Sequence, residues 1–118
     1  MIGGATAVHQ NVRIGAHAFI GGLAGVEGDV IPFALASGNR AQLFGLNLVG
    51  LKRRGFAAER VESLRRAYGL LFTRKDARVL SERIEMLSQD CAGDADVAAI
   101  LDFLRAPSTR PLCVPPAR

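Results

Sequence analysis

Apolar residues recur at every sixth position over the first part of the chain, at Ile2, Val8, Ile14, Ile20 and Val26. A helix requires apolar positions three and four residues apart, and a half-buried strand requires them two apart. Neither period explains a spacing of six. Such a repeat is typical of a solenoid in which each hexad contributes one short strand and one corner.

A second row of small or branched residues supports the same interpretation. It is offset from the first row by four positions and comprises Val12, Ala18, Ala24 and Val30. In a hexapeptide β-helix the lead aliphatic points into the prism, and the small residue lies inside near a corner. Glycine follows the lead residue at Gly3, Gly15 and Gly21, where we expect it to supply the backbone angles of the corners. The pattern therefore predicts terminal coils of a parallel β-helix over residues 1–38.

The repeat opens with a complete hexad directly after Met1 and shows no capping segment. An uncapped coil exposes an open strand edge and an apolar end, here at Ile2 and Val8. We therefore expect the end of a longer solenoid, or a solenoid completed by another chain. On the same grounds we expect the isolated chain to self-associate.

The pattern changes to a helical period after the turn signals at Pro32 and residues 37–39. Residues 43–55 predict a short helix that ends at Gly55, and residues 57–72 predict a longer one. Two more helices are expected, one opening at Asp76 and one at Asp94 or Asp96. The sequence thus predicts a helical C-terminal domain over residues 39–106. Four prolines in the last thirteen residues predict a loose tail over 107–118.

Composition narrows the class of protein. Of the 118 residues, 49% are hydrophobic and 22% charged, which is an ordinary balance for a soluble domain. The net charge of +4 and the pI near 9.8 favour anionic partners. Aromatic side chains do not interleave with the basic ones, which argues against nucleic acid. Cys91 and Cys113 lack metal-ligand spacing, so we expect reduced thiols, a cytoplasmic location and no metal. The sequence has no run of about 20 apolar residues, so we expect no transmembrane segment.

Three strings of residues resemble one enzyme family. They are "GGATAVHQ" (Gly3 to Gln10), "GNRA" (Gly38 to Ala41) and "FGLNLVGLKRRGF" (Phe44 to Phe56). Together they resemble the C-terminal part of the UDP-N-acetylglucosamine O-acyltransferases, which catalyse the first step of lipid A biosynthesis. The chain departs from the family pattern at Asn11, where a Phe is usual, and at Ile31, where a Pro is usual.

The resemblance implies a left-handed parallel β-helix, with three hexads per coil, followed by an α-helical C-terminal domain in a homotrimer. It implies transfer of a 3-hydroxyacyl chain from acyl carrier protein to UDP-N-acetylglucosamine. It also implies that no resident cofactor is needed, because the acyl chain arrives on the phosphopantetheine of the carrier protein. The catalytic histidine of the family is expected upstream of residue 1. We therefore expect the isolated chain to be inactive.

The resemblance also assigns roles to individual residues. The implied substrate-binding residues are His9, Gln10, Asn47, Arg53 and Arg54. Gly22 matches the position that floors the acyl groove and measures the length of the chain. Arg53 and Arg54 are candidates for gripping the two phosphates of UDP, because guanidinium groups bind phosphate through paired hydrogen bonds.

Other interpretations of these residues remain open from the sequence. His9 has the chemistry of a general base but also suits a surface or packing position. Lys52, Arg53 and Arg54 also suit the last turn of a solvated helix, where positive charge is favourable. His17 occupies a different hexad position from His9 and is interpreted as a packing residue. The alternative function is a non-catalytic interaction module that binds an anionic partner or a full-length acyltransferase.

Overall fold

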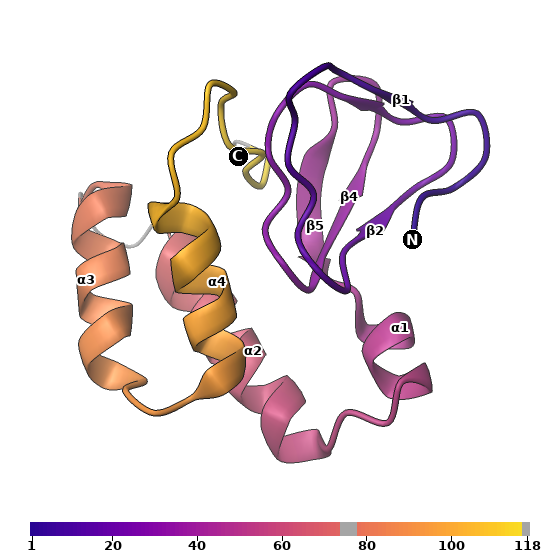
Figure 1. Cartoon of the computed structure of the whole chain (residues 1–118). Helices are drawn as coiled ribbons and strands as arrows, with labels where there is room; N and C mark the ends of the chain where they lie inside the picture. The colour runs from indigo at the N-terminus through magenta and orange to yellow at the C-terminus, as the bar shows by residue number, and fades with distance from the viewer. Residues whose placement is uncertain (74–77, 117–118) are drawn as a thin grey trace.

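The computed structural model describes residues 1–73 and 78–116, and within them an N-terminal stack of short strands is followed by helices (Figure 1). The strands are β1 (Ala7–Val8), β2 (Phe19–Ile20), β3 (Gly25–Val26), β4 (Ala34–Ser37) and β5 (Gln42–Leu46). The helices are α1 (Leu48–Arg53), α2 (Ala58–Phe72), α3 (Leu80–Asp90) and α4 (Ala95–Arg105). We call residues 1–46 the stack.

The chain completes one turn of the stack in about three hexads. Ile2 pairs in parallel with Ile20, and β1 pairs in parallel with β3, in each case with a partner 18 positions further along the chain. Farther along, β2 pairs in parallel with β4 at a separation of 16 positions. Hydrogen bonds such as Gly3 N–H to Ile20 O at 2.7 Å join successive turns. The hexad spacing thus produces parallel pairing between turns.

Burial follows the two predicted rows, but only in the second turn. Ile20 and Val26 are 0% and 1% exposed, whereas Ile2 and Val8 are 52% and 41% exposed. The small-residue row is buried at Ala18, Ala24 and Val30. The second turn is therefore covered by the first turn on one side and by β4 on the other. The first turn has solvent on its outer side.

The corners of the stack differ from the sequence-based expectation about glycine. In the first two turns the left-handed residues are Ala5, Asn11, His17 and Leu23, which are six apart and have φ between 56° and 67°. Gly15 instead lies close to the next turn, because a Cβ added there would stand 2.3 Å from the nitrogen of Pro32. Glycine at the position after the lead residue is therefore required by close approach between turns, and the prediction that it supplies the corner angles is wrong.

The stack extends beyond its predicted end at residue 38. β5 (Gln42–Leu46) pairs antiparallel with β4, and the first helix begins only at Leu48. Leu43 and Leu46 are buried while Gln42 and Phe44 are exposed, so the inner face of this strand still belongs to the core. Residues 39–46 therefore belong to the stack, and the sequence placed the start of the helical part too early.

The predicted helices are present, and each of α2 and α4 buries one apolar face. Leu64, Ala67 and Leu71 of α2 are buried, as are Val97, Ile100 and Leu101 of α4. Asp94 caps α4, because its side chain accepts hydrogen bonds from the N–H groups of Asp96 and Val97. The predicted start of the third helix at Asp76 lies outside the described residues, and α3 begins at Leu80.

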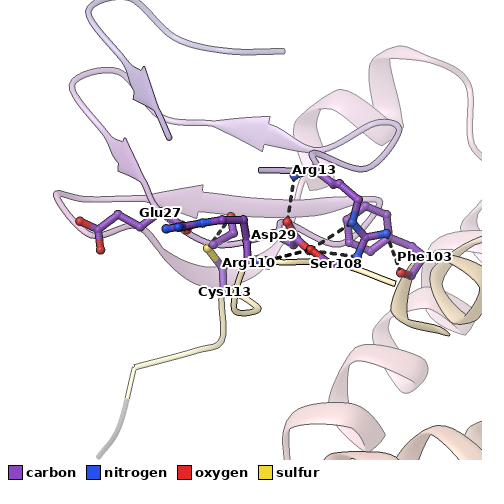
Figure 2. Close-up of polar contacts among 8 residues, drawn as sticks. Arg13, Glu27, Asp29, Phe103, Ser108, Arg110 and Cys113 are labelled. Atoms are coloured by element: carbon purple, nitrogen blue, oxygen red, sulfur yellow. Dashed lines mark hydrogen bonds and ion pairs between the residues drawn. The ribbon is translucent and has the colours of Figure 1, made fainter. Parts of the chain in front are cut away.

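The C-terminal segment does not form the loose tail that the sequence predicts. Its described residues return from α4 to the stack, where Leu112 pairs with Asp29 and Cys113 is 5% exposed (Figure 1). The guanidinium of Arg110 donates two hydrogen bonds to the carbonyl of Glu27, at 2.9 and 2.7 Å (Figure 2). Proline does not prevent this arrangement, because a proline keeps its carbonyl: Pro111 accepts from the N–H of Asp29 at 2.7 Å, and the N–H of Cys113 donates to the carbonyl of Asp29 at 2.8 Å.

Candidate functional site

A cavity of about 700 Å³ lies where the stack meets α1. Phe19, Leu35 and Phe44 form an apolar wall from three neighbouring strands. Asn47 and the two arginines Arg53 and Arg54 line the side that α1 contributes. The cavity therefore combines an apolar surface with two positive charges.

The apolar wall is held in place from behind by α2. The backbone N–H of Gly45, between Phe44 and Leu46, donates a hydrogen bond to the hydroxyl of Tyr68 at 3.1 Å. Burial raises the pKa of Tyr68 although the Gly45 hydrogen bond opposes it, so the hydroxyl stays neutral at physiological pH. This contact fixes β5 on the helical part and leaves Phe44, 55% exposed, facing outward.

Asn47 starts the helix that carries the two arginines. Its side-chain oxygen accepts a hydrogen bond from the N–H of Gly50 at 3.1 Å, which is an N-cap interaction. Its side-chain amide donates to the carbonyl of His17 at 3.0 Å. Asn47 therefore links the stack to α1 and has both ends of its amide engaged within the protein.

Arg53 and Arg54 stand at the C-terminal end of α1, where positive charge is favoured by the helix dipole. Both are exposed, and in the part of the chain that the structure describes neither has an ion-pair or hydrogen-bond partner for its guanidinium. Two guanidinium groups without a partner at the edge of a cavity are available to an anion.

His17 also lines the cavity, which the sequence did not indicate. Its ring stacks on Phe33 and meets the ring of Phe56 edge-on, at centroid distances of 5.6 and 5.2 Å. Its Nδ1 is buried and has no hydrogen-bond partner among the described residues. The sequence indicates only that His17 lies at a corner, because it follows Asn11 by six residues. Asn and His both tolerate the positive φ found at these two positions.

The remaining predicted site residues are elsewhere in the stack. His9 and Gln10 are exposed, and Nδ1 of His9 lies 2.9 Å from the carbonyl oxygen of Gln10. Gly22 is exposed at a corner, directly before the left-handed residue Leu23. The structure thus brings Asn47, Arg53 and Arg54 together, whereas His9, Gln10 and Gly22 are not among the residues that line this cavity.

The geometry of the cavity suits binding more than proton transfer. Guanidinium groups stay protonated and can hold phosphate or carboxylate oxygens, and the wall of Phe19, Leu35 and Phe44 can cover an apolar group. None of the helices in the described residues has both the length and the apolar character to cross a membrane.

Comparisons with known proteins agree on one family. A family model described as UDP N-acetylglucosamine O-acyltransferase, domain 2, matches residues 29–113. The chain is 41% identical over 110 residues to an acyl-[acyl-carrier-protein]–UDP-N-acetylglucosamine O-acyltransferase of Burkholderia orbicola, covering 90% of this chain and 41% of the relative. It is 51% identical over 90 residues to the enzyme of that name from Caulobacter vibrioides, covering 76% and 34%.

Solved structures lead to the same family. The UDP-N-acetylglucosamine acyltransferase of Arabidopsis superposes with a TM-score of 0.87 and 38% identity, covering 95% of this chain and 41% of that one. The acyltransferase of Francisella novicida superposes with a TM-score of 0.86 and 28% identity, covering 98% and 41%. The chain therefore spans 34% to 41% of the length of these relatives.

Proposed function

The chain belongs to the UDP-N-acetylglucosamine O-acyltransferase family, and from that premise we propose that it forms the C-terminal part of such an enzyme. The enzyme transfers a 3-hydroxyacyl chain from acyl carrier protein to UDP-N-acetylglucosamine, the first step of lipid A biosynthesis. The part of the reaction proposed for this chain is the binding of the sugar nucleotide. We place that activity in the cytoplasm.

The observation that carries the proposal is the pair of arginines at the cavity. A nucleoside diphosphate presents two phosphates next to the flat face of a base and to hydrogen-bonding groups. Arg53 and Arg54 supply charge at one side of the cavity, and Phe19, Leu35 and Phe44 supply apolar surface at another. Arginine forms stronger and more directional contacts with phosphate than lysine does, because its guanidinium offers parallel donors.

The proposal extends to the fold and to the assembly. Parallel pairing at a separation of three hexads supports the terminal coils of a left-handed parallel β-helix that is followed by an α-helical domain. The exposed apolar side chains of Phe44, Leu48 and Val49, which line the cavity, support a homotrimer in which a neighbouring subunit closes its open side.

His9, Gln10 and Gly22 are proposed to act in the cleft between subunits. His9 and Gln10 are exposed and can hydrogen-bond substrate there. Gly22 is proposed as the residue that sets the length of the acyl chain, because its lack of a side chain leaves space at the corner. No resident cofactor is part of the proposal, since the acyl chain arrives on the phosphopantetheine of acyl carrier protein.

Binding of UDP-N-acetylglucosamine to the purified chain tests the nucleotide site. We expect binding by isothermal titration calorimetry, loss of at least about tenfold in affinity for Arg53→Ala, and weaker binding at higher salt. Arg65→Ala removes the same charge from an exposed position on α2, so it should bind like the wild type. Equal losses in the two variants would mean that net charge, and not this site, attracts the nucleotide.

We propose that catalysis needs a general base outside the set of binding residues, which comprises His9, Gln10, Asn47, Arg53 and Arg54. Supplying the chain alone with 3-hydroxyacyl carrier protein and UDP-N-acetylglucosamine should therefore give no turnover. Loss of a general base alone lowers the rate by about 10²- to 10⁴-fold. Measurable turnover would contradict this and would direct attention to His9 and His17 as bases.

A further inference from the structure

Helix α1 is attached to the stack at its N-terminal end through the carbonyl of His17. That carbonyl accepts a hydrogen bond from the side-chain amide of Asn47 at 3.0 Å. The same Asn47 side chain caps α1 by accepting from the N–H of Gly50. The first turn of α1 is therefore tied to one corner of the stack.

His17 also contacts the segment that follows the C-terminal end of α1. Phe56 comes two residues after Arg54, and its N–H donates to the carbonyl of Leu51 at 3.1 Å. The His17 ring meets the Phe56 ring at 5.2 Å with an interplanar angle of 72°, a favourable edge-to-face geometry. His17 thus contacts residues on both sides of α1, Asn47 before it through its backbone carbonyl and Phe56 after it through its ring.

A helix of six residues is too short to be stable by its own hydrogen bonds, so its position depends on such attachments. We propose that His17 is a positioning residue that clamps α1 and thereby holds Arg53 and Arg54 at the cavity. The proposal rests on the proposed function, because it takes these arginines as the nucleotide-binding groups. His17 acts through α1 and makes no required contact with the nucleotide.

The surroundings of the His17 ring favour packing as its role. The ring lies against Phe33 on one face, nearly parallel to it at 6°, and against Phe56 at the edge. Its Nδ1 is buried without a hydrogen-bond partner among the described residues. A buried nitrogen without a partner costs free energy, so the ring contributes here by its shape and not by its polarity.

Two substitutions separate the ring from its nitrogens. His17→Phe keeps an aromatic ring between Phe33 and Phe56 and removes both nitrogens. His17→Asn removes the ring and keeps a side chain that tolerates the left-handed backbone. Both fit the φ of 61° at this position, because Asn11 and Phe33 themselves adopt φ of 67° and 69° in the stack.

The first measurement needs no ligand. Hydrogen exchange of the backbone amides of Leu51 and Arg54, followed by NMR, reports how firmly α1 is held. His17→Asn should accelerate exchange at both amides by about tenfold, the size expected for lost aromatic contacts. Exchange at Ala98 in α4 should not change, and His17→Phe should exchange like the wild type. Unchanged exchange at Leu51 and Arg54 in His17→Asn would overturn the proposal.

A substitution of Phe56, the other partner of the ring contact, tests the proposal if His17→Asn does not fold. Phe56→Leu keeps an apolar side chain and leaves His17 in place, but it removes the ring that His17 meets. It should accelerate exchange at Leu51 and Arg54 in the same way. Exchange at the wild-type rate in this variant would also overturn the proposal.

The second measurement uses UDP as the probe. His17→Asn should raise the dissociation constant about tenfold, as we also expect for Arg53→Ala, and His17→Phe should leave it unchanged. Equal weakening in both His17 variants would mean that a ring nitrogen contacts the nucleotide, which overturns the clamp. If the wild type does not bind UDP, the proposed function fails, whereas the exchange measurement still decides whether His17 holds α1.

Discussion

Arg13 holds the carboxylate of Asp29 with its backbone N–H and with two nitrogens of its guanidinium, at distances of 2.9 to 3.1 Å (Figure 2). The same guanidinium lies 4.2 Å from the centroid of the Phe103 ring and donates to the Phe103 carbonyl. One arginine of the stack therefore binds both a buried acid of the stack and helix α4. This contact fixes the helical part on the stack.

Arg13→Ala should lower the free energy of unfolding by about 3 kcal/mol. Asp29 is 2% exposed, so removal of Arg13 leaves a buried carboxylate without its cationic partner. This loss in the free energy of unfolding lies at the low end for buried ion pairs because the side chain of Arg13 is itself 30% exposed. Urea denaturation followed by circular dichroism measures the change. Arg65→Ala, which removes an exposed arginine from α2, should change stability by less than about 0.5 kcal/mol.

The same carboxylate should make stability depend on acid pH. Burial alone would raise the pKa of Asp29, but hydrogen bonds from Arg13 and Ser108 and the charge of Arg13 outweigh it and lower the pKa. Because the folded pKa lies below the unfolded value of about 3.9, the stabilisation is present above that pH. It is lost as the pH falls through the folded pKa.

Asp29→Asn tests this pH dependence. The variant should be less stable at pH 7 and should lose less stability than the wild type between about pH 4 and 2. Some slope should remain, because the hydrogen bond from Ser63 lowers the pKa of Asp94 although burial opposes it. Parallel curves for the two proteins would show that Asp29 does not contribute.

Gly15→Ala should destabilise the stack, whereas Gly4→Ala should not. A Cβ at Gly15 would lie 2.3 Å from the backbone nitrogen of Pro32, which cannot move without shifting the next turn. A Cβ at Gly4 would have no atom within 4 Å. We expect a loss of about 3 kcal/mol for Gly15→Ala and less than about 0.5 kcal/mol for Gly4→Ala. Similar melting temperatures for the two variants would contradict the close approach.

Periodic features could be predicted from the sequence because each of them repeats a local rule. The rows that contain Ile20 and Val26, and the apolar faces of α2 and α4, depend only on spacing along the chain. The role of glycine could not be predicted in this way. The contact that excludes a side chain at Gly15 comes from Pro32, which is a neighbour only after the turns have stacked.

The candidate site was predictable only in part, for the same reason. Asn47, Arg53 and Arg54 lie within one string of residues, and the structure keeps them together at one cavity. His17 is 30 positions before Asn47, so only folding brings them into contact. Proline content predicts a loose C-terminal segment, whereas the pairing of Leu112 with Asp29 depends on the folded stack and leaves no local pattern in the sequence.

The paired C-terminal segment should protect one of the two cysteines. Cys113 is 5% exposed and its thiol lies 3.4 Å from the carbonyl oxygen of Gly28, whereas Cys91 is half-buried at the end of α3. Burial raises the pKa of the Cys113 thiol, which lowers the fraction of reactive thiolate. Iodoacetamide at pH 8 should therefore modify Cys113 at least about tenfold more slowly than Cys91, and equally fast in urea.

Loosening the segment should remove this protection selectively. Arg110→Ala deletes the guanidinium that holds the carbonyl of Glu27, so Cys113 should be modified faster while Cys91 is not affected. Arg105→Ala is the matched control, because its ion pair with Glu85 joins α4 to α3 and does not involve the segment. Mass spectrometry of the labelled peptides measures both rates. Rapid modification of Cys113 in the wild type would show that the segment does not stay on the stack, because neither burial nor the Gly28 contact could then shield the thiol.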